Sequence, residues 1–254
     1  RDVERSRGLG DVYKRQAYMK PWKTRMNVHV INVETTEETR LTSSEDRGIY
    51  GYGWLGNSRI GYAKDDGGDE NIHFFAVNID GTNEIDLTPY ENVQARLIDD
   101  LEDDPDHIIL GLNKRDPRIH DAFRVNVTNG TTKLIAENPG NISGWMTDHG
   151  GKLRIATTSD GVNTSLLYRD SESDEFETIL TTDFKVSVAP LFFTFDNKNL
   201  YVSSNRDRDK AAIYTFDIKE AKEKELILLN LALIEAERLL RFLSLLKIIQ
   251  RSMH

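Results

Sequence analysis

The sequence offers few side chains of the kinds that catalyse reactions. It contains six histidines and no cysteine, so cysteine nucleophiles, disulfides and thiolate metal sites are excluded. The G-x-S-x-G turn that presents a serine nucleophile is absent, and its nearest approaches, GNSRIG and GNISGW, have the wrong spacing. His73 and His120 lie near the starts of equivalent predicted strands, but one position out of register. A single strand histidine is usually a packed residue, and we predict no catalytic residue in this chain.

Two acidic stretches are the strongest candidates for a metal site. They are DDGGDEN at 65–71 and DDLEDDPD at 99–106, and neither follows the alternating D-x-[DN]-x-[DN]-G pattern of a calcium loop. Solvated loop acids are the ordinary explanation for such stretches. We therefore predict no metal ligand and no bound cofactor.

A repeat of about 46 residues organises the elements on which these side chains lie. Polar residues follow apolar strands five times, with spacings of 46, 48, 44 and 47: Asn32, Asn78, Asn126, Asp170 and Asp217. Eight or nine residues after each of them stands an apolar residue of the next predicted strand: Leu41, Leu87, Leu134, Ile179 and Leu226. Each pair of strands reads as a hairpin, as in FFAVNIDGTNEIDLT at 74–88, where Asp80-Gly81 is a turn signal.

Between these hairpins the sequence predicts a second pair of strands, for example in IYGYGWLGNSRIGYAKD and APLFFTFDNKNLYVSSN. Two pairs of strands per repeat make one four-stranded antiparallel blade of a β-propeller. The predicted fold class is all-β, a partial propeller of about four to five blades in an open arc. It comprises half of one blade (27–42), three full blades (48–88, 93–136 and 142–181) and three strands of another (186–218). A β-sandwich is the alternative architecture.

The two ends of the chain do not follow the repeat. Residues 1–17 lack an apolar pattern, and we predict that this segment is non-native or disordered. Residues 219–254 contain no glycine or proline and are rich in helix formers, which predicts a helical tail that is not native to the fold. An interaction helix is the alternative, and the charges of Glu235, Arg238 and Arg241 argue against a membrane span. The propeller is therefore expected at 18–218.

Charged residues of both signs recur in the loops that join the second and third strands of successive predicted blades. Equivalent loops of a propeller emerge on one face, so these charges would share a rim. Mixed charges on a rim can orient a docked partner or domain, although loops are polar in most proteins. The candidate docking residues are Asp65, Asp69, Glu70, Arg115, Asp116, Arg118, Arg206, Asp207 and Arg208.

Composition narrows the partners further. The net charge of −9 and the pI near 5.2 argue against a nucleic-acid partner, which calls for a clustered basic surface. The segment RDVERSRGLG has no apolar run behind it, so no signal peptide is visible at the start of the sequence. With the absence of cysteine, this predicts a cytoplasmic location without membrane association.

A series of motifs occurs in order and with the spacing that the blades require. It includes EDRGIYGYGW, DDGGDENIHFFAVNIDG, GLNKRDPRIHDAFRVN and LYVSSNRDRDKAAIYTFD. From about residue 18 to about residue 220, the chain closely resembles the N-terminal propeller of bacterial prolyl oligopeptidase-family members. These are serine peptidases of the dipeptidyl aminopeptidase or acylaminoacyl-peptidase type.

The resemblance implies a propeller that carries no nucleophile and caps an α/β-hydrolase domain, which holds a Ser-Asp-His triad. It also implies that the partners are this hydrolase domain and short peptide substrates. The triad maps onto no position of this chain, so we expect an inactive fragment that gates a serine oligopeptidase. A stand-alone protein-binding propeller is the main alternative. A third alternative is a propeller enzyme with its own central site. Such a site needs carboxylates or metal ligands that face inward from the innermost strands, and none occurs in the predicted innermost strands YGYGW, VQARL, ISGWM and SVAPLFF.

Overall fold

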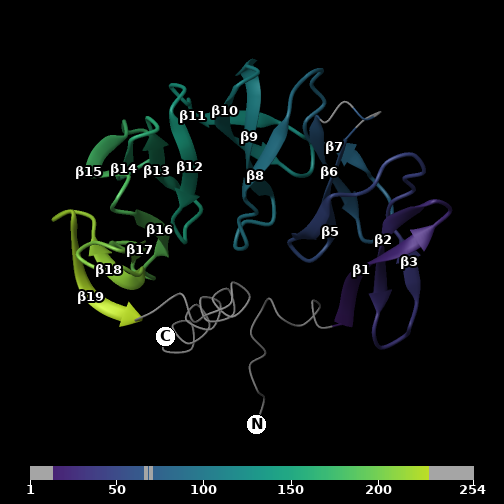
Figure 1. Cartoon of the computed structure of the whole chain (residues 1–254). Coiled ribbons are helices and arrows are strands. Elements are labelled where there is room, and N and C mark those ends of the chain that lie inside the picture. The colour runs from purple at the N-terminus through teal and green to yellow at the C-terminus, as the bar shows by residue number, and fades with distance from the viewer. Residues whose placement is uncertain (1–13, 66–67, 69–70, 229–254) are drawn as a thin grey trace, which may run out of the picture. The chain divides into compact units, whose positions relative to one another are not determined.

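The computed structural model describes residues 14–65, 68 and 71–228 (Figure 1). Throughout these residues the regular elements are β-strands, and no α-helix is present among them. The chain divides into two compact units, unit 1 (Arg1–Gly140) and unit 2 (Asn141–His254), and each is described by itself. Within the described part of the chain, no helix has the length and apolar character needed to cross a membrane.

Unit 1 contains three antiparallel sheets, each built from strands that follow one another in sequence. The strands of the first sheet are β1 (Arg15–Trp22), β2 (Arg25–Asn32) and β3 (Glu38–Arg40). Those of the second are β4 (Gly51–Leu55), β5 (Arg59–Asp65), β6 (Ile72–Asn78) and β7 (Ile85–Asp86). Those of the third are β8 (Ala95–Asp99), β9 (His107–Asp116), β10 (Ile119–Asn126) and β11 (Thr132–Ala136).

Unit 2 contains two sheets of the same kind, each with four strands in sequence order. The strands of the first are β12 (Ile142–Thr147), β13 (Leu153–Ser159), β14 (Asn163–Tyr168) and β15 (Glu177–Asp183). Those of the second are β16 (Val188–Phe193), β17 (Asn199–Ser204), β18 (Ala212–Asp217) and β19 (Lys222–Leu228). Residues of both sheets, among them Ile155 and Phe216, form one apolar core.

The second sheet of unit 1 is buried on both faces, which distinguishes blades from a sandwich. On one face Ile60 shares an apolar core with Val28 of the first sheet. On the other face Leu55 shares a core with Ile108 of the third sheet. A sandwich has two sheets that each bury one face, whereas stacked blades bury both. The prediction of an all-β partial propeller with four-stranded antiparallel blades is confirmed.

Three of the five repeated polar residues, Asn32, Asn126 and Asp217, close the turn before the last strand of a blade. Asn126 Oδ1 accepts hydrogen bonds from the backbone N–H groups of Thr128 and Asn129 at 2.9 and 3.1 Å. Asn32 makes the equivalent pair of bonds after β2, and Asp217 accepts one from Glu220 at 2.9 Å. A side chain that bonds the backbone two or three residues ahead stabilises a tight turn. This local chemistry explains why the sequence repeat was detectable.

In the three sheets of unit 1, a second set of polar residues fixes the chain in the last strand of the sheet or just after it, and we call these residues the exit clamps. Asn27, His73 and Asp121 are spaced by 46 and 48, which matches the turn-closing residues. Asn27 is fully buried, and its Oδ1 accepts a bond from the backbone N–H of Ser44 at 2.7 Å. Asp121 Oδ1 accepts the equivalent bond from Asn138 at 2.7 Å. His73 Nδ1 lies 3.1 Å from a carboxylate oxygen of the β7 residue Asp86.

The structure differs from the sequence prediction at both ends. The predicted first blade contained only 27–42, whereas β1 begins at Arg15 and pairs with β2 without a register shift. The predicted helical tail began at residue 219, whereas Lys222–Leu228 forms β19, the fourth strand of its blade. Pairing with β18 overrides the helix propensity of this segment. Residues 1–13 and 229–254 of the two end segments lie outside the described residues.

Candidate functional site

Two predicted docking residues of the β9–β10 loop, Asp116 and Arg118, form an ion pair with each other. Arg118 Nε and Nη2 donate to the two carboxylate oxygens of Asp116 at 3.0 and 2.7 Å. These bonds and the backbone N–H of Arg118 lower the pKa of Asp116. The Arg118 side chain is 83% exposed, so this loop presents a pair of opposite charges to solvent.

Arg115, in contrast, forms hydrogen bonds within its own blade. Its guanidinium donates to both oxygens of the buried Asp121 at 3.0 and 2.8 Å, and to the carbonyl of Asn138 at 2.7 Å. The carboxylate raises the pKa of Arg115. Because Asp121 also accepts the Asn138 backbone N–H, Arg115 completes an exit clamp. The sequence predicted Arg115 as a docking residue and contained no direct signal for this structural role.

Asp65 is buried at the end of β5 and forms an ion pair with Arg47. Arg47 Nε lies 3.1 and 3.0 Å from the two carboxylate oxygens, and these bonds lower the pKa of Asp65. Asp65 therefore presents no exposed carboxylate at the surface. The neighbouring candidates Asp69 and Glu70 lie outside the described residues.

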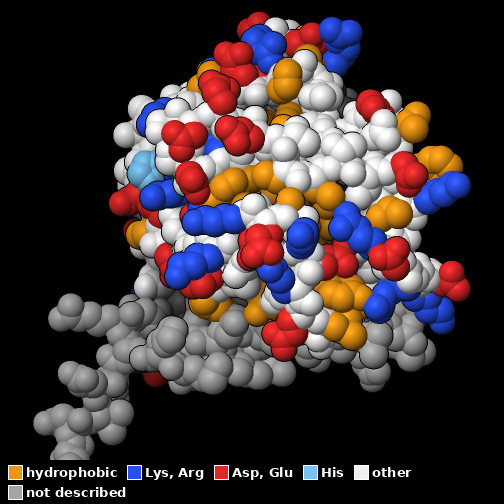
Figure 2. All heavy atoms as spheres, turned by 90° about the vertical axis from the view of Figure 1, so that its left-hand side faces the viewer, with side chains coloured by type: hydrophobic (Ala, Val, Ile, Leu, Met, Phe, Trp, Pro, Cys, Tyr) orange, Lys and Arg blue, Asp and Glu red, His pale blue; other side chains and the backbone are white. Residues whose placement is uncertain are grey.

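The β17–β18 loop of unit 2 carries Arg206, Asp207 and Arg208. Asp207 is exposed and has a φ of 58°, in the left-handed region that tight turns use. Arg208 is exposed, and its guanidinium lies 5.2 Å from the centre of the Tyr214 ring, which orients it. On the face drawn in Figure 2, basic and acidic side chains are interspersed and form no large patch of one sign. The shared docking rim stays a prediction.

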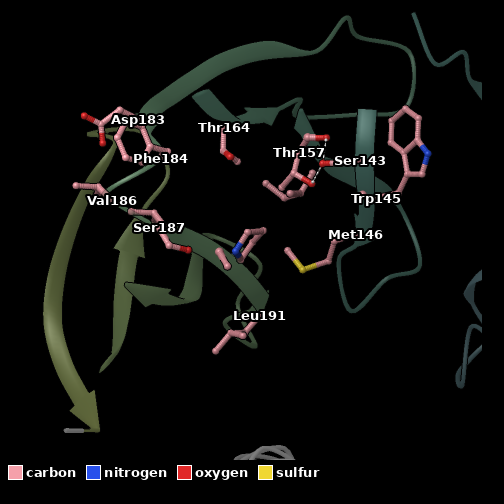
Figure 3. A pocket seen from close by; sticks show the side chains of 15 residues that line it. Ser143, Trp145, Met146, Thr157, Thr164, Asp183, Phe184, Val186, Ser187 and Leu191 are labelled. Atoms are coloured by element: carbon pink, nitrogen blue, oxygen red, sulfur yellow. Dashed lines mark hydrogen bonds between the residues drawn. The ribbon is translucent and has the colours of Figure 1, made fainter. Parts of the chain in front are cut away.

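A cleft of about 610 Å³ lies between the two sheets of unit 2 (Figure 3). Its lining comes from β12, β13 and β14 on one side, and from β16 with the segment before it on the other. Ser143 Oγ lies 3.1 Å from the carbonyl oxygen and 3.2 Å from the hydroxyl of Thr157. Phe184 and Val186 line the cleft on the side of the β15–β16 connection. Asp183 is the one ionisable residue among those that line this cleft.

A second cleft, of about 470 Å³, lies within unit 1 between its second and third sheets. Aromatic residues and glycines of β4 form much of its lining, including Tyr52, Gly53 and Trp54. Arg96 and Asp100 lie on the side of the third sheet. Both clefts therefore border the first strand of a blade, which the sequence repeat could not reveal because it depends on how adjacent sheets pack.

The lining of the two clefts is suited to binding. No histidine is among the described residues that line them, so Ser143 has no imidazole base beside it. The described part of the chain also brings together no group of three His, Asp or Glu side chains that could hold a metal ion. The chemistry available is hydrogen bonding by hydroxyl and backbone groups together with apolar contact.

Sequence comparison adds a curated relative. An alignment of 208 residues that covers 78% of this chain shows 30% identity to dipeptidyl aminopeptidase BIII of Pseudoxanthomonas mexicana. The matched region spans 29% of that relative's length. The chain resembles the β-propeller region of the prolyl oligopeptidase family. No family model matches the sequence.

Solved structures of the family share the fold. Porphyromonas gingivalis dipeptidyl peptidase 4 aligns with 84% of this chain and 37% of its own, at 11% identity and a TM-score of 0.59. A structure from a study of two prolyl endopeptidases aligns with 85% of this chain and 35% of its own, at 13% identity and a TM-score of 0.60. At such identities the likeness concerns the fold alone. The expected resemblance to this family is confirmed.

Proposed function

We propose that this chain is the non-catalytic propeller region that controls substrate entry in a serine oligopeptidase. Its role is to exclude folded or long chains and to admit short peptides to a separate catalytic domain. Stacked blades suit exclusion because adjacent sheets are held together by apolar cores. The peptide bond is then cut elsewhere, by a serine nucleophile that forms an acyl-enzyme.

The observation that carries this proposal is the 30% identity to a dipeptidyl aminopeptidase over 78% of the chain. Two features of the chain support it. The sequence contains no G-x-S-x-G turn. The described residues that line the clefts include no histidine, and all of them except Asp183, Arg96 and Asp100 are uncharged. A binding and gating role fits these features better than a reaction centre inside the propeller.

The partner that we propose is an α/β-hydrolase domain, and the substrates are short peptides. Exposed charged residues of the second-to-third-strand loops, above all Arg118 and Arg208, are the candidates for contact with that domain. A cytoplasmic location stays a prediction from the sequence.

The experiment is a chimera in which residues 15–228 replace the matching region of the dipeptidyl aminopeptidase relative. We expect the chimera to hydrolyse a dipeptidyl 4-nitroanilide, while the 254-residue chain alone stays at background. Turnover by the chain alone would contradict the non-catalytic role. A folded chimera without activity, together with tight capture of an intact protein by the chain alone, would favour the stand-alone scaffold.

A further inference from the structure

The cleft of unit 1 is an opening in an apolar core. Its lining includes Leu55, Ala95 and Ile108, which belong to the core between the second and third sheets. Phe74 packs against that core and also lines the cleft, and the Leu97 side chain beside it is 51% exposed. Apolar surface that is left open to water is unfavourable, and another apolar group would gain free energy by covering it.

One wall of this cleft is bare backbone. Gly51 and Gly53 alternate along β4 with Leu55, so the three residues lie on one face of the strand. A Cβ built at Gly51 or Gly53 has no other atom within 4 Å. Their register partners on β5 are Ala63 and Gly61, which add one methyl group between them. The backbone is therefore open on this face at Gly51 and Gly53, whereas the Leu55 side chain covers Gly61.

The usual structural reasons for glycine in a strand do not apply to Gly51 and Gly53. The pairing of β4 with β5 runs through five consecutive residues without a bulge. Neither glycine has a positive φ. The remaining common reason is the close approach of a ligand or of another backbone.

β4 also has a free edge. Among the described strands it pairs with β5 alone and stands at the end of its sheet, so the backbone groups of its other edge have no strand partner. Such an edge can accept an extended peptide as an additional strand. In that mode the backbone bonds give affinity, and a pocket for one side chain gives specificity.

The shape and chemistry of the cleft favour an aromatic side chain over an aliphatic one. An aromatic ring presents a flat face that can lie against the open backbone at Gly51 and Gly53. Arg96 lines the cleft, and its Nε and Nη2 donate to Gln94 Oε1 at 3.3 and 3.0 Å, which holds the guanidinium in place. A fixed guanidinium can stack on an aromatic ring.

We propose that this site binds an extended peptide segment that carries an aromatic side chain. The peptide backbone pairs with the free edge of β4, and the ring enters the cleft over Gly51 and Gly53. Because binding uses unit 1 alone and needs no catalytic domain, the site does not depend on the proposed gating role.

The test uses the 254-residue chain and three capped tripeptides that differ in the central residue, which is phenylalanine, leucine or alanine. Isothermal titration calorimetry should give the phenylalanine peptide an affinity at least about tenfold higher than the other two, a difference of roughly 1.4 kcal/mol. Equal affinity for the leucine peptide would overturn the aromatic assignment. Failure of the phenylalanine peptide to bind would overturn the site.

Two glycine variants localise the binding. Gly53→Val places its Cβ in open space, narrows the cleft and should lower the affinity for the phenylalanine peptide at least about tenfold. Gly48→Val is the matched control, since Gly48 is exposed, has the same open surroundings and does not line the cleft. It should change the affinity by less than about twofold. Unchanged binding by Gly53→Val would contradict the proposal.

Leu97→Ala is a second variant of the cleft, for the case in which Gly53→Val weakens binding only because it unfolds the chain. Leu97 is half exposed, so its truncation should leave the thermal unfolding midpoint close to that of the parent chain. It should still weaken binding, because Leu97 contributes apolar surface to the cleft. If Leu97→Ala and Gly53→Val both bind as tightly as the parent, the peptide binds elsewhere and the proposal is wrong.

Discussion

Single buried polar side chains hold the chain in place as it passes from one blade to the next. Asn27 is fully buried and bonds the hydroxyl of Thr42 at 2.9 Å and both backbone groups of Ser44. A buried donor or acceptor that loses its partner costs about 1–3 kcal/mol. The exit clamps therefore stabilise the connections between blades, in addition to the turns that Asn32 and Asn126 close at the surface.

Asn27→Ala tests how much one exit clamp contributes to stability. The substitution removes four hydrogen bonds from a buried site and should lower the free energy of unfolding by about 2–3 kcal/mol, measured by urea unfolding. Asn129→Ala is the control, because Asn129 is exposed and its side chain bonds the turn residue Thr131. It should cost less than about 1 kcal/mol. Equal losses for the two variants would show that burial of Asn27 is unimportant.

Asp65 makes unit 1 sensitive to acid. The bonds from Arg47 lower its pKa in the folded state, so the ionised carboxylate stabilises the fold above its unfolded pKa. This contribution disappears as the pH falls through about 4 and below, toward the folded pKa. Asp65→Asn should be less stable than the parent at neutral pH, and the two should converge once the pH is below the lowered folded pKa of Asp65.

Urea unfolding at several pH values measures this convergence, with the exposed Asp207→Asn as control. The control should follow the pH dependence of the parent chain. A constant difference between Asp65→Asn and the parent at every pH would exclude an ionic contribution from Asp65.

At the scale of the element, the last described strand shows how sheet pairing can override local preference. The backbone N–H of Glu225 donates to Thr215 Oγ1 at 3.0 Å, and Ser204 Oγ donates to Glu223 Oε1 at 2.6 Å. These contacts tie β19 to β18 and β17. Leu226 of β19 pairs with Tyr214 in register, where the repeat of apolar residues expected a strand.

Glu225→Pro tests whether this segment is a strand. Proline removes the N–H that bonds Thr215, and the variant should lose about 2 kcal/mol or more of unfolding free energy by urea titration. Glu225→Ala keeps the N–H and should stay within about 0.5 kcal/mol of the parent. Similar stability for both variants would contradict the pairing of β19.

The sequence was most informative where structure depends on near neighbours. Asx turns such as that of Asn126 require only a few residues, so the repeat predicted the order of the strands and the four-stranded blade. Strand β1 was missed because RQAYMKPW contains charges and Pro21, and its stability comes from pairing with β2. The clefts depend on gaps between sheets. The one sequence signal was the pair of alternating glycines in YGYGW, which line the cleft of unit 1.

At the scale of the whole molecule, two units of the same construction follow one another along the chain. Each contains apolar cores between successive sheets and a cleft beside the first strand of a blade. Within each unit the sheets are fixed by their cores. We propose that this construction acts as a substrate filter, and the sequence is similar to part of a dipeptidyl aminopeptidase.

The most direct test of this role is the substrate size selectivity of the chimera that carries residues 15–228. Its kcat/KM is measured for a dipeptidyl 4-nitroanilide and for a long unfolded polypeptide with the same two N-terminal residues. We predict that kcat/KM for the long substrate is at least about 100-fold lower, because the propeller region restricts entry. Equal values for the two substrates would contradict the gating role.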